Sequence, residues 1–176
     1  MMITAAAALL LLQQAPADNT DWDAIFGVEE KVRDPETGEL PVEPYVEDNA
    51  NAGADPFESG KMAQQFGGRE GIRRISDRLV ELNYADPRVA DIFIAHDRVR
   101  LERTLFEQFC YILGAGCDYT GRDMASSHAS LGTTRADLNA LVENLQQAMR
   151  ESDVPFHAQN RFLAKLAPMS KDVVTR

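Results

Sequence analysis

The first candidate for chemistry in this 176-residue chain is His128, which closes the run YTGRDMASSH that begins at Tyr119. A neutral imidazole is the commonest metal ligand in proteins. Gly121 provides a turn, and the residues after it are compatible with a short helix that carries His128. A single histidine on a short helix is, by itself, more often a surface or hydrogen-bonded core residue than a metal ligand. The elements around it must decide between the two interpretations.

A helix predicted over residues 97–113 could place an apolar surface near this histidine. Asp97 is the candidate N-cap of that helix. Leu101, Leu105 and Phe109 recur every four residues and therefore share one face. A second apolar stripe lies beside the first and consists of Val99, Phe106, Cys110 and Leu113. An apolar arc of this width must be covered on two sides.

Two helices are predicted before that one. Apolar residues recur at helical spacing over residues 70–84. Pro87 ends this helix, because the residue before a proline avoids the helical region. A short apolar helix follows over residues 89–93.

Two amphipathic helices are predicted in the last third of the chain. Thr134 and Asp137 have the spacing of a capping box, with Asp in place of Glu. Pro155 opens the last helix, where its missing N–H costs nothing, and Pro168 should kink it. The buried face of this helix is expected to hold Phe156, Phe162, Leu163, Leu166, Met169 and Val173. No alternating strand pattern follows Phe66, so we expect an all-α domain.

The first 60 residues are expected to precede a domain at residues 61–176. Residues 1–17 contain an apolar run and end in Ala-Pro-Ala, a pattern typical of a secretory signal. The run is too short to span a bilayer. No Lys or Arg precedes it, so a merely apolar tail is the alternative. Residues 18–60 are acidic and rich in Pro, Gly, Asn and Asp, and this composition predicts a poorly ordered linker.

The net charge of −10 is concentrated before the domain. Residues 18–65 hold 13 acidic and 3 basic side chains, whereas residues 66–176 hold 15 of each. Without a basic stripe, nucleic-acid binding is not expected. Cys110 and Cys117 fit no common zinc spacing, which leaves either two buried thiols or a local disulfide formed in an oxidising compartment.

The order of several short motifs resembles that of group I truncated haemoglobins, the two-over-two helical globins. The resemblance covers residues 66–174. It is carried by FGG at 66–68, ADP at 85–87, IF at 92–93, QFC at 108–110, YTGRDM at 119–124, His128, VPF at 154–156 and AQNRFLAKLAPM at 158–169. The resemblance implies a truncated globin fold with an N-terminal extension.

The resemblance also implies haem b (iron protoporphyrin IX) bound between the helix at 97–113 and the segment around His128. His128 matches the proximal iron ligand of the family. The cofactor-binding residues implied are Phe93, Leu101, Thr104, Leu105, Phe109, Tyr119, Met124 and Leu141. An apolar stripe facing a lone histidine suits a flat apolar cofactor with one protein ligand to iron, although it also fits the plain core of a small bundle.

The chain departs from the family on the distal side, where the gas ligand binds. Many relatives carry a Tyr at the position of Val80 and a Gln at the position of Leu105, and both supply hydrogen bonds to bound oxygen. Thr104 is the nearest polar side chain expected at the distal edge, and Tyr84 lies one turn after Val80. The distal pocket is therefore expected to be unusually apolar. His96 and His157 match no ligand position and are expected to be solvated.

Reversible binding of oxygen, for transport or sensing, is the function that the resemblance implies, with nitric oxide and carbon monoxide as further ligands. The alternative is an enzyme that oxidises nitric oxide and needs a separate reductase, because no flavin or nicotinamide motif is present. A helical interaction domain without haem is the third possibility. If the signal is real, we expect a periplasmic or secreted protein without a stable membrane anchor in the mature chain, and otherwise a cytoplasmic one.

Overall fold

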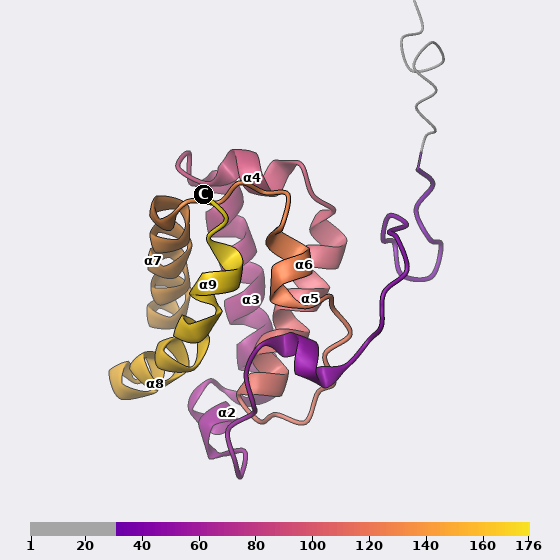
Figure 1. Cartoon of the computed structure of the whole chain (residues 1–176). Helices are drawn as coiled ribbons and strands as arrows, with labels where there is room; N and C mark the ends of the chain where they lie inside the picture. Colours follow the sequence, from indigo (N-terminus) through magenta and orange to yellow (C-terminus); the bar gives the residue numbers. More distant parts are fainter. Residues whose placement is uncertain (1–30) are drawn as a thin grey trace, which may run out of the picture. The chain divides into compact units, whose positions relative to one another are not determined.

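The computed structural model describes residues 31–176 of the chain, and α3 (Gly68–Ala85) lies at the centre of the helical part. It packs against α5 (Arg98–Ile112) on one side and α7 (Arg135–Glu151) on the other (Figure 1). Its apolar residues recur at helical spacing, so one broad face of α3 is removed from water. That face includes Ile72, Ile75, Leu79 and Val80, each at most 1% exposed.

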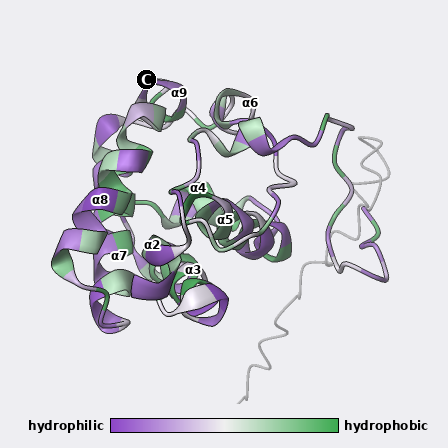
Figure 2. Cartoon of the chain, turned by 90° about the horizontal axis from the view of Figure 1, so that it is seen from below, coloured by the Kyte–Doolittle hydropathy of each residue, from purple (hydrophilic) through white to green (hydrophobic). Residues whose placement is uncertain are grey.

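Shorter helices complete the described structure. They are η1 (Asn49–Ala52), α2 (Lys61–Gln65), α4 (Ala90–Ile94), α6 (Met124–His128), α8 (Phe156–Leu166), η2 (Ala167–Met169) and α9 (Ser170–Val173). Hydrophobic and hydrophilic residues are mixed along the labelled helices (Figure 2). The buried residues of α2 and α8 face the core. Within residues 31–176 no strand is present, which confirms the predicted all-α class.

Phe162 of α8 is the aromatic centre of the core. Its ring meets the rings of Phe66 and Phe109 edge to face, with centroids 5.3 and 5.1 Å apart. Edge-to-face pairs place the positive ring edge against the negative face of the partner. These contacts join α8 to α5 and to the turn before α3.

The capping box at the start of α7 is present as predicted, with the Asp137 amide donating to the Thr134 hydroxyl and the Thr134 amide to the Asp137 carboxylate. Pro168 ends the regular helix at Leu166, and a 3-10 turn follows. One expectation was wrong. Phe156 is 74% exposed, because Ala158 and Phe162 occupy the inward face of α8. Asp97 is the N-cap residue of α5, as predicted, although its carboxylate makes no cap bond because it is bonded elsewhere.

Residues 32–60 pack against the helices, in contrast to the poorly ordered linker expected for residues 18–60. Ala52 is fully buried, and the amide of Phe57 donates to the carbonyl of Ile112 at 2.8 Å. This acidic segment lacks a large apolar face, so hydrogen bonds from its side chains and main chain hold it in place. The rest of the expected linker and the expected signal peptide at 1–17 lie outside the described residues. Between residues 31 and 176, no helix has the length and apolar character needed to cross a membrane.

Candidate cofactor site

His128 lies at the end of α6, a helix of 5 residues. Asp123 begins this helix, since its carboxylate accepts hydrogen bonds from the Ser126 amide at 2.9 Å and the Ser126 hydroxyl at 2.7 Å. The bond from the Ser126 amide is the main reason that the pKa of Asp123 is lowered. A side chain at the N-cap satisfies an amide that would otherwise lack a partner in the first turn. Local hydrogen bonding therefore sets where α6 starts.

The ring of His128 is oriented by its own helix. Its Nδ1 lies 2.7 Å from the main-chain carbonyl oxygen of Met124, one turn earlier. A carbonyl oxygen only accepts hydrogen bonds, so Nδ1 carries the proton in this pair. In the neutral ring, Nε2 then has a free lone pair. The half-buried imidazole thus offers one nitrogen to a metal, and the bond at Nδ1 fixes the ring plane.

No group of three or more His, Cys, Asp or Glu side chains within residues 31–176 is arranged to hold a metal ion. A metal bound at His128 would need most of its ligands from elsewhere. A porphyrin supplies four ring nitrogens and requires one axial protein ligand. The donor set around His128 therefore fits haem better than it fits a bare ion.

The apolar residues expected to contact haem fall into two groups. Phe93, Leu101, Leu105, Met124 and Leu141 are only partly buried and lie on α4, α5, α6 and α7. Partly buried large apolar side chains on several elements leave apolar surface for a flat cofactor to cover. The partial burial of these five side chains therefore fits their expected contact with haem.

Phe109 and Tyr119 lie deeper than the other expected contacts. Phe109 is 3% exposed and packs on Phe162 in the core. The Tyr119 hydroxyl donates to the carbonyl of Arg122 at 2.9 Å, and burial raises the pKa of this phenol. Both side chains are therefore part of the buried core of the described structure.

The polar side chains expected at the distal edge are bonded to the main chain. The Thr104 hydroxyl donates to the carbonyl of Arg100 at 2.9 Å. The Tyr84 hydroxyl points to the carbonyl of His96 at 3.4 Å, and the Arg98 guanidinium lies 5.2 Å from its ring centroid. Val80 is fully buried. Because both hydroxyl groups already donate to main-chain carbonyls, neither Thr104 nor Tyr84 is free to donate a hydrogen bond to a ligand on the distal side.

The remaining histidines lie on the surface. His96 follows α4, and His157 is in the first turn of α8. Both side chains are exposed, as expected from the sequence.

Gln108 on α5 was missed as a candidate. It is 7% exposed, and its amide nitrogen donates to the carbonyl of Ala52 at 2.9 Å. The same nitrogen lies 3.3 Å from the sulfur of Met124. Gln108 follows Leu105 by three residues, so a polar residue within an apolar stripe was the available signal.

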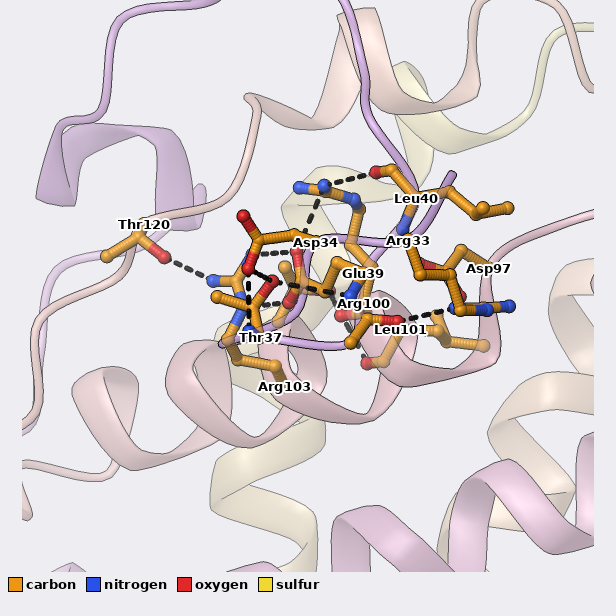
Figure 3. Close-up of polar contacts among 12 residues, drawn as sticks. Arg33, Asp34, Thr37, Glu39, Leu40, Asp97, Arg100, Leu101, Arg103 and Thr120 are labelled. Atoms are coloured by element: carbon orange, nitrogen blue, oxygen red, sulfur yellow. Dashed lines mark hydrogen bonds and ion pairs between the residues drawn. The ribbon is translucent and has the colours of Figure 1, made fainter. Parts of the chain in front are cut away.

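The outer face of α5 is bound by residues 33–40, which were expected to belong to a poorly ordered linker. Glu39 is 6% exposed and forms ion pairs with Arg100 and Arg103 (Figure 3). Asp97 accepts from Arg33 at 2.7 Å and from the Leu40 amide at 2.8 Å. Burial alone would raise the pKa of Asp97, but these bonds together lower it.

A disulfide joins Cys110 of α5 to Cys117 in the following loop, with Cα atoms 5.6 Å apart. Of the two alternatives left by the sequence, the structure therefore has the disulfide. The bond ties the end of α5 to the loop that leads into Tyr119 and α6. No other cysteine is present in the chain.

Comparison with known proteins places the fold in a known group. Residues 62–175 match the family model described as bacterial-like globin. A truncated haemoglobin from Tetrahymena pyriformis in the Fe(III) form superposes with a TM-score of 0.63 at 20% identity, over 65% of this chain and 98% of that one. The 2/2 haemoglobin from Synechococcus sp. PCC 7002, in the cyanomet state with covalently attached haem, gives 0.60 at 21% identity over the same shares. At these identities the two structures establish the fold.

Proposed function

This chain belongs to the bacterial-like globin family, and we propose that it holds haem b through His128 and binds oxygen reversibly at the iron. Membership of a globin family supports haem-based binding of diatomic gases in general. The observation that carries the proposal for His128 is the bond between its Nδ1 and the Met124 carbonyl, which leaves Nε2 free for iron.

In this proposal, each side of the haem is covered by a separate part of the chain. Leu101 and Leu105 of α5 would cover the distal face, while Met124 of α6 would cover the proximal one. Leu141 would lie on the side opposite Met124, and Phe93 would pack on the porphyrin near α4. All five side chains are partly buried, so a bound porphyrin would remove their remaining apolar surface from water.

Haem iron supplies the ligand chemistry, and the protein supplies the axial histidine and the distal environment. Because Thr104 and Tyr84 donate to main-chain carbonyls, the ligand would be held mainly by the iron. We expect weaker retention of oxygen than in a globin with a distal donor.

The proposal is tested by the absorption spectrum of the purified protein after titration with haem, first oxidised and then reduced under oxygen or carbon monoxide. Reversible, stoichiometric spectral changes are expected. If only the spectrum of free haem is seen, the protein does not bind the cofactor. The chain would then be a helical interaction domain without haem. Rapid consumption of nitric oxide by the oxygen-bound protein, sustained by an added reductase, would instead support the dioxygenase alternative.

We also propose that the chain is exported and cut after residue 17. The disulfide between Cys110 and Cys117 supports an oxidising compartment, because cytosolic thiols are kept reduced. N-terminal sequencing of protein from its native cell tests this. A cytoplasmic protein that still begins at Met1 or Met2 contradicts it.

A further inference from the structure

The turn η1 lies against the loop that leads into α6. The side chain of Asn49 binds two consecutive residues of this loop. Its amide nitrogen donates to the Asp118 carboxylate at 3.0 Å, and its oxygen accepts from the Tyr119 amide at 2.7 Å. Asn51 adds a bond of 3.2 Å to the carbonyl of Gly121. Two residues of η1, Asn49 and Asn51, thus hold the loop by polar bonds to residues 118, 119 and 121.

The end of η1 contacts α5 and α6 together. The carbonyl of Ala52 accepts from Gln108, whose nitrogen also lies 3.3 Å from the sulfur of Met124. Gly53 follows with φ +82°, and a Cβ built on it would lie 3.1 Å from Met124 Cγ. This approach is closer than ordinary van der Waals contact, so the main chain packs directly on the first residue of α6 without an intervening side chain.

Met124 connects these contacts to the candidate iron ligand. Its side chain meets Gln108 and Gly53, while its carbonyl accepts from the ring of His128. An unbroken set of contacts therefore runs from the extension, through one buried amide and one methionine, to the imidazole.

A helix as short as α6 cannot fix its own geometry. Isolated helices shorter than about 12 residues are marginal in water, because nucleation is unfavourable. Tertiary contacts must therefore position it, and α9 packs beside it as well. The contacts from residues 49–53 fall on the first residue of α6 and on the loop before it.

We propose that residues 49–53, acting through Gln108 and Met124, are a positioning element for His128. The proposal rests on the proposed function in one respect, namely that His128 binds haem iron. The proposal adds that residues 49–53, which lie before the region matched by the globin family, set the orientation of α6.

The chain provides a matched pair of variants for the test. Gln108→Leu removes the bond to Ala52 and the contact with the Met124 sulfur. Gln159→Leu is the control, because Gln159 is 5% exposed and donates to a main-chain carbonyl, that of Val154, at 2.7 Å. Both changes remove one buried side-chain amide. The bond of Gln159 joins α8 to the residues just before it, whereas the contacts of Gln108 reach η1 and α6.

The first measurement is hydrogen exchange in the haem-free protein. Gln108→Leu should speed exchange of the amides at 119–128 by about tenfold, whereas Gln159→Leu should leave them unchanged. The second measurement is the iron–histidine stretching frequency of the reduced haem-bound protein. It should shift in Gln108→Leu and stay at the wild-type value in the control.

Asn49→Ala serves as a second variant if Gln108→Leu does not fold, since it removes the bonds to Asp118 and Tyr119 from an intermediate-exposure position. Equal exchange at 119–128 in variant and control overturns the positioning element. Faster exchange with an unshifted stretching frequency overturns its action on His128. If the wild type binds no haem, the proposed function fails, while the exchange experiment still decides whether η1 orders α6.

Discussion

Glu39 and Arg103 form a two-point ion pair across 64 residues of chain. The Nε and Nη2 atoms of Arg103 donate to the two carboxylate oxygens of Glu39, and Arg100 lies 3.0 Å from one of them. Planar guanidinium groups match a carboxylate at two points, which makes such pairs stronger than single contacts. One acidic residue of the extension is therefore fixed to the first half of α5.

Replacement of Glu39 by Ala should destabilise the protein by about 2 kcal/mol, because two arginines lose a nearly buried partner. The cost is less than for a fully buried pair, since both guanidinium groups remain partly exposed. Urea unfolding measures it. Glu151→Ala, which removes an exposed pair with Arg78, is the control and should leave the midpoint nearly unchanged. Equal effects of the two variants would contradict the buried role of Glu39.

His128→Ala should abolish or greatly weaken haem retention, because it removes the nitrogen that we propose binds the iron. Loss of haem should also lower the melting temperature of the haem-loaded sample, since a ligand bound only by the folded state stabilises it. Haem titration followed by gel filtration measures retention. His157→Ala, an exposed histidine on α8, should bind haem as the wild type does. A wild-type spectrum in His128→Ala would show that another residue binds the iron.

Leu105→Gln should slow the release of oxygen about fivefold, because one neutral hydrogen bond contributes about 1 kcal/mol. Leu105 is partly buried, so an amide of similar size can be accommodated there. Carbon monoxide release should change far less, since that ligand is less polar when bound. Stopped-flow dissociation measures both rates, and Leu105→Met is the size-matched control without a donor.

Thr104→Val and Tyr84→Phe should leave oxygen release unchanged, because both hydroxyl groups already donate to carbonyls. Slow oxygen release in the wild type that persists in both variants would reveal a different donor and would refute an apolar distal pocket. The same stopped-flow measurements decide this point.

Reduction of the disulfide should lower the free energy of unfolding by roughly 2.5 kcal/mol on the chain-entropy view of a short closed loop. Urea unfolding with and without reductant measures the difference. The double variant Cys110→Ala, Cys117→Ala should be insensitive to reductant. Intact mass should rise by two hydrogens on reduction, and alkylation of native, unreduced protein at both thiols would show that the bond is absent.

Acid should destabilise the protein in part through Asp123. Its pKa is lowered in the folded state by the bonds from Ser126, so the unfolded chain binds more protons. The stabilisation is therefore complete above the unfolded pKa of about 3.9 and is lost as the pH falls through the folded value. Asp123→Asn keeps the cap but does not titrate. Its unfolding free energy should decline less steeply than that of the wild type below about pH 4.

The features predicted correctly from the sequence depend on local patterns. Thr134 and Asp137 are three residues apart and determine each other's bonds, so the capping box was visible without a structure. The apolar stripes of α3 and α5 likewise indicated an all-α fold. Such features are encoded within one or two helical turns.

The features that were missed depend on partners distant in the chain. Asn49 bonds to Asp118, and Gln108 to Ala52, over separations of 69 and 56 residues. No periodicity identifies such pairs in a polar segment. Glu39 was placed in a linker for the same reason, since composition alone does not show which carboxylate is buried.

Because Ala52 is buried, the packed core begins earlier in the chain than the region that matches the globin family. The globin family match begins at residue 62, but Ala52 and Phe57 already contribute to the core or pack against it. The region shared with the family and the region that packs as one core therefore begin at different residues. A protein shortened to the matched residues would retain the helices of a globin and expose the surface that this upstream segment covers.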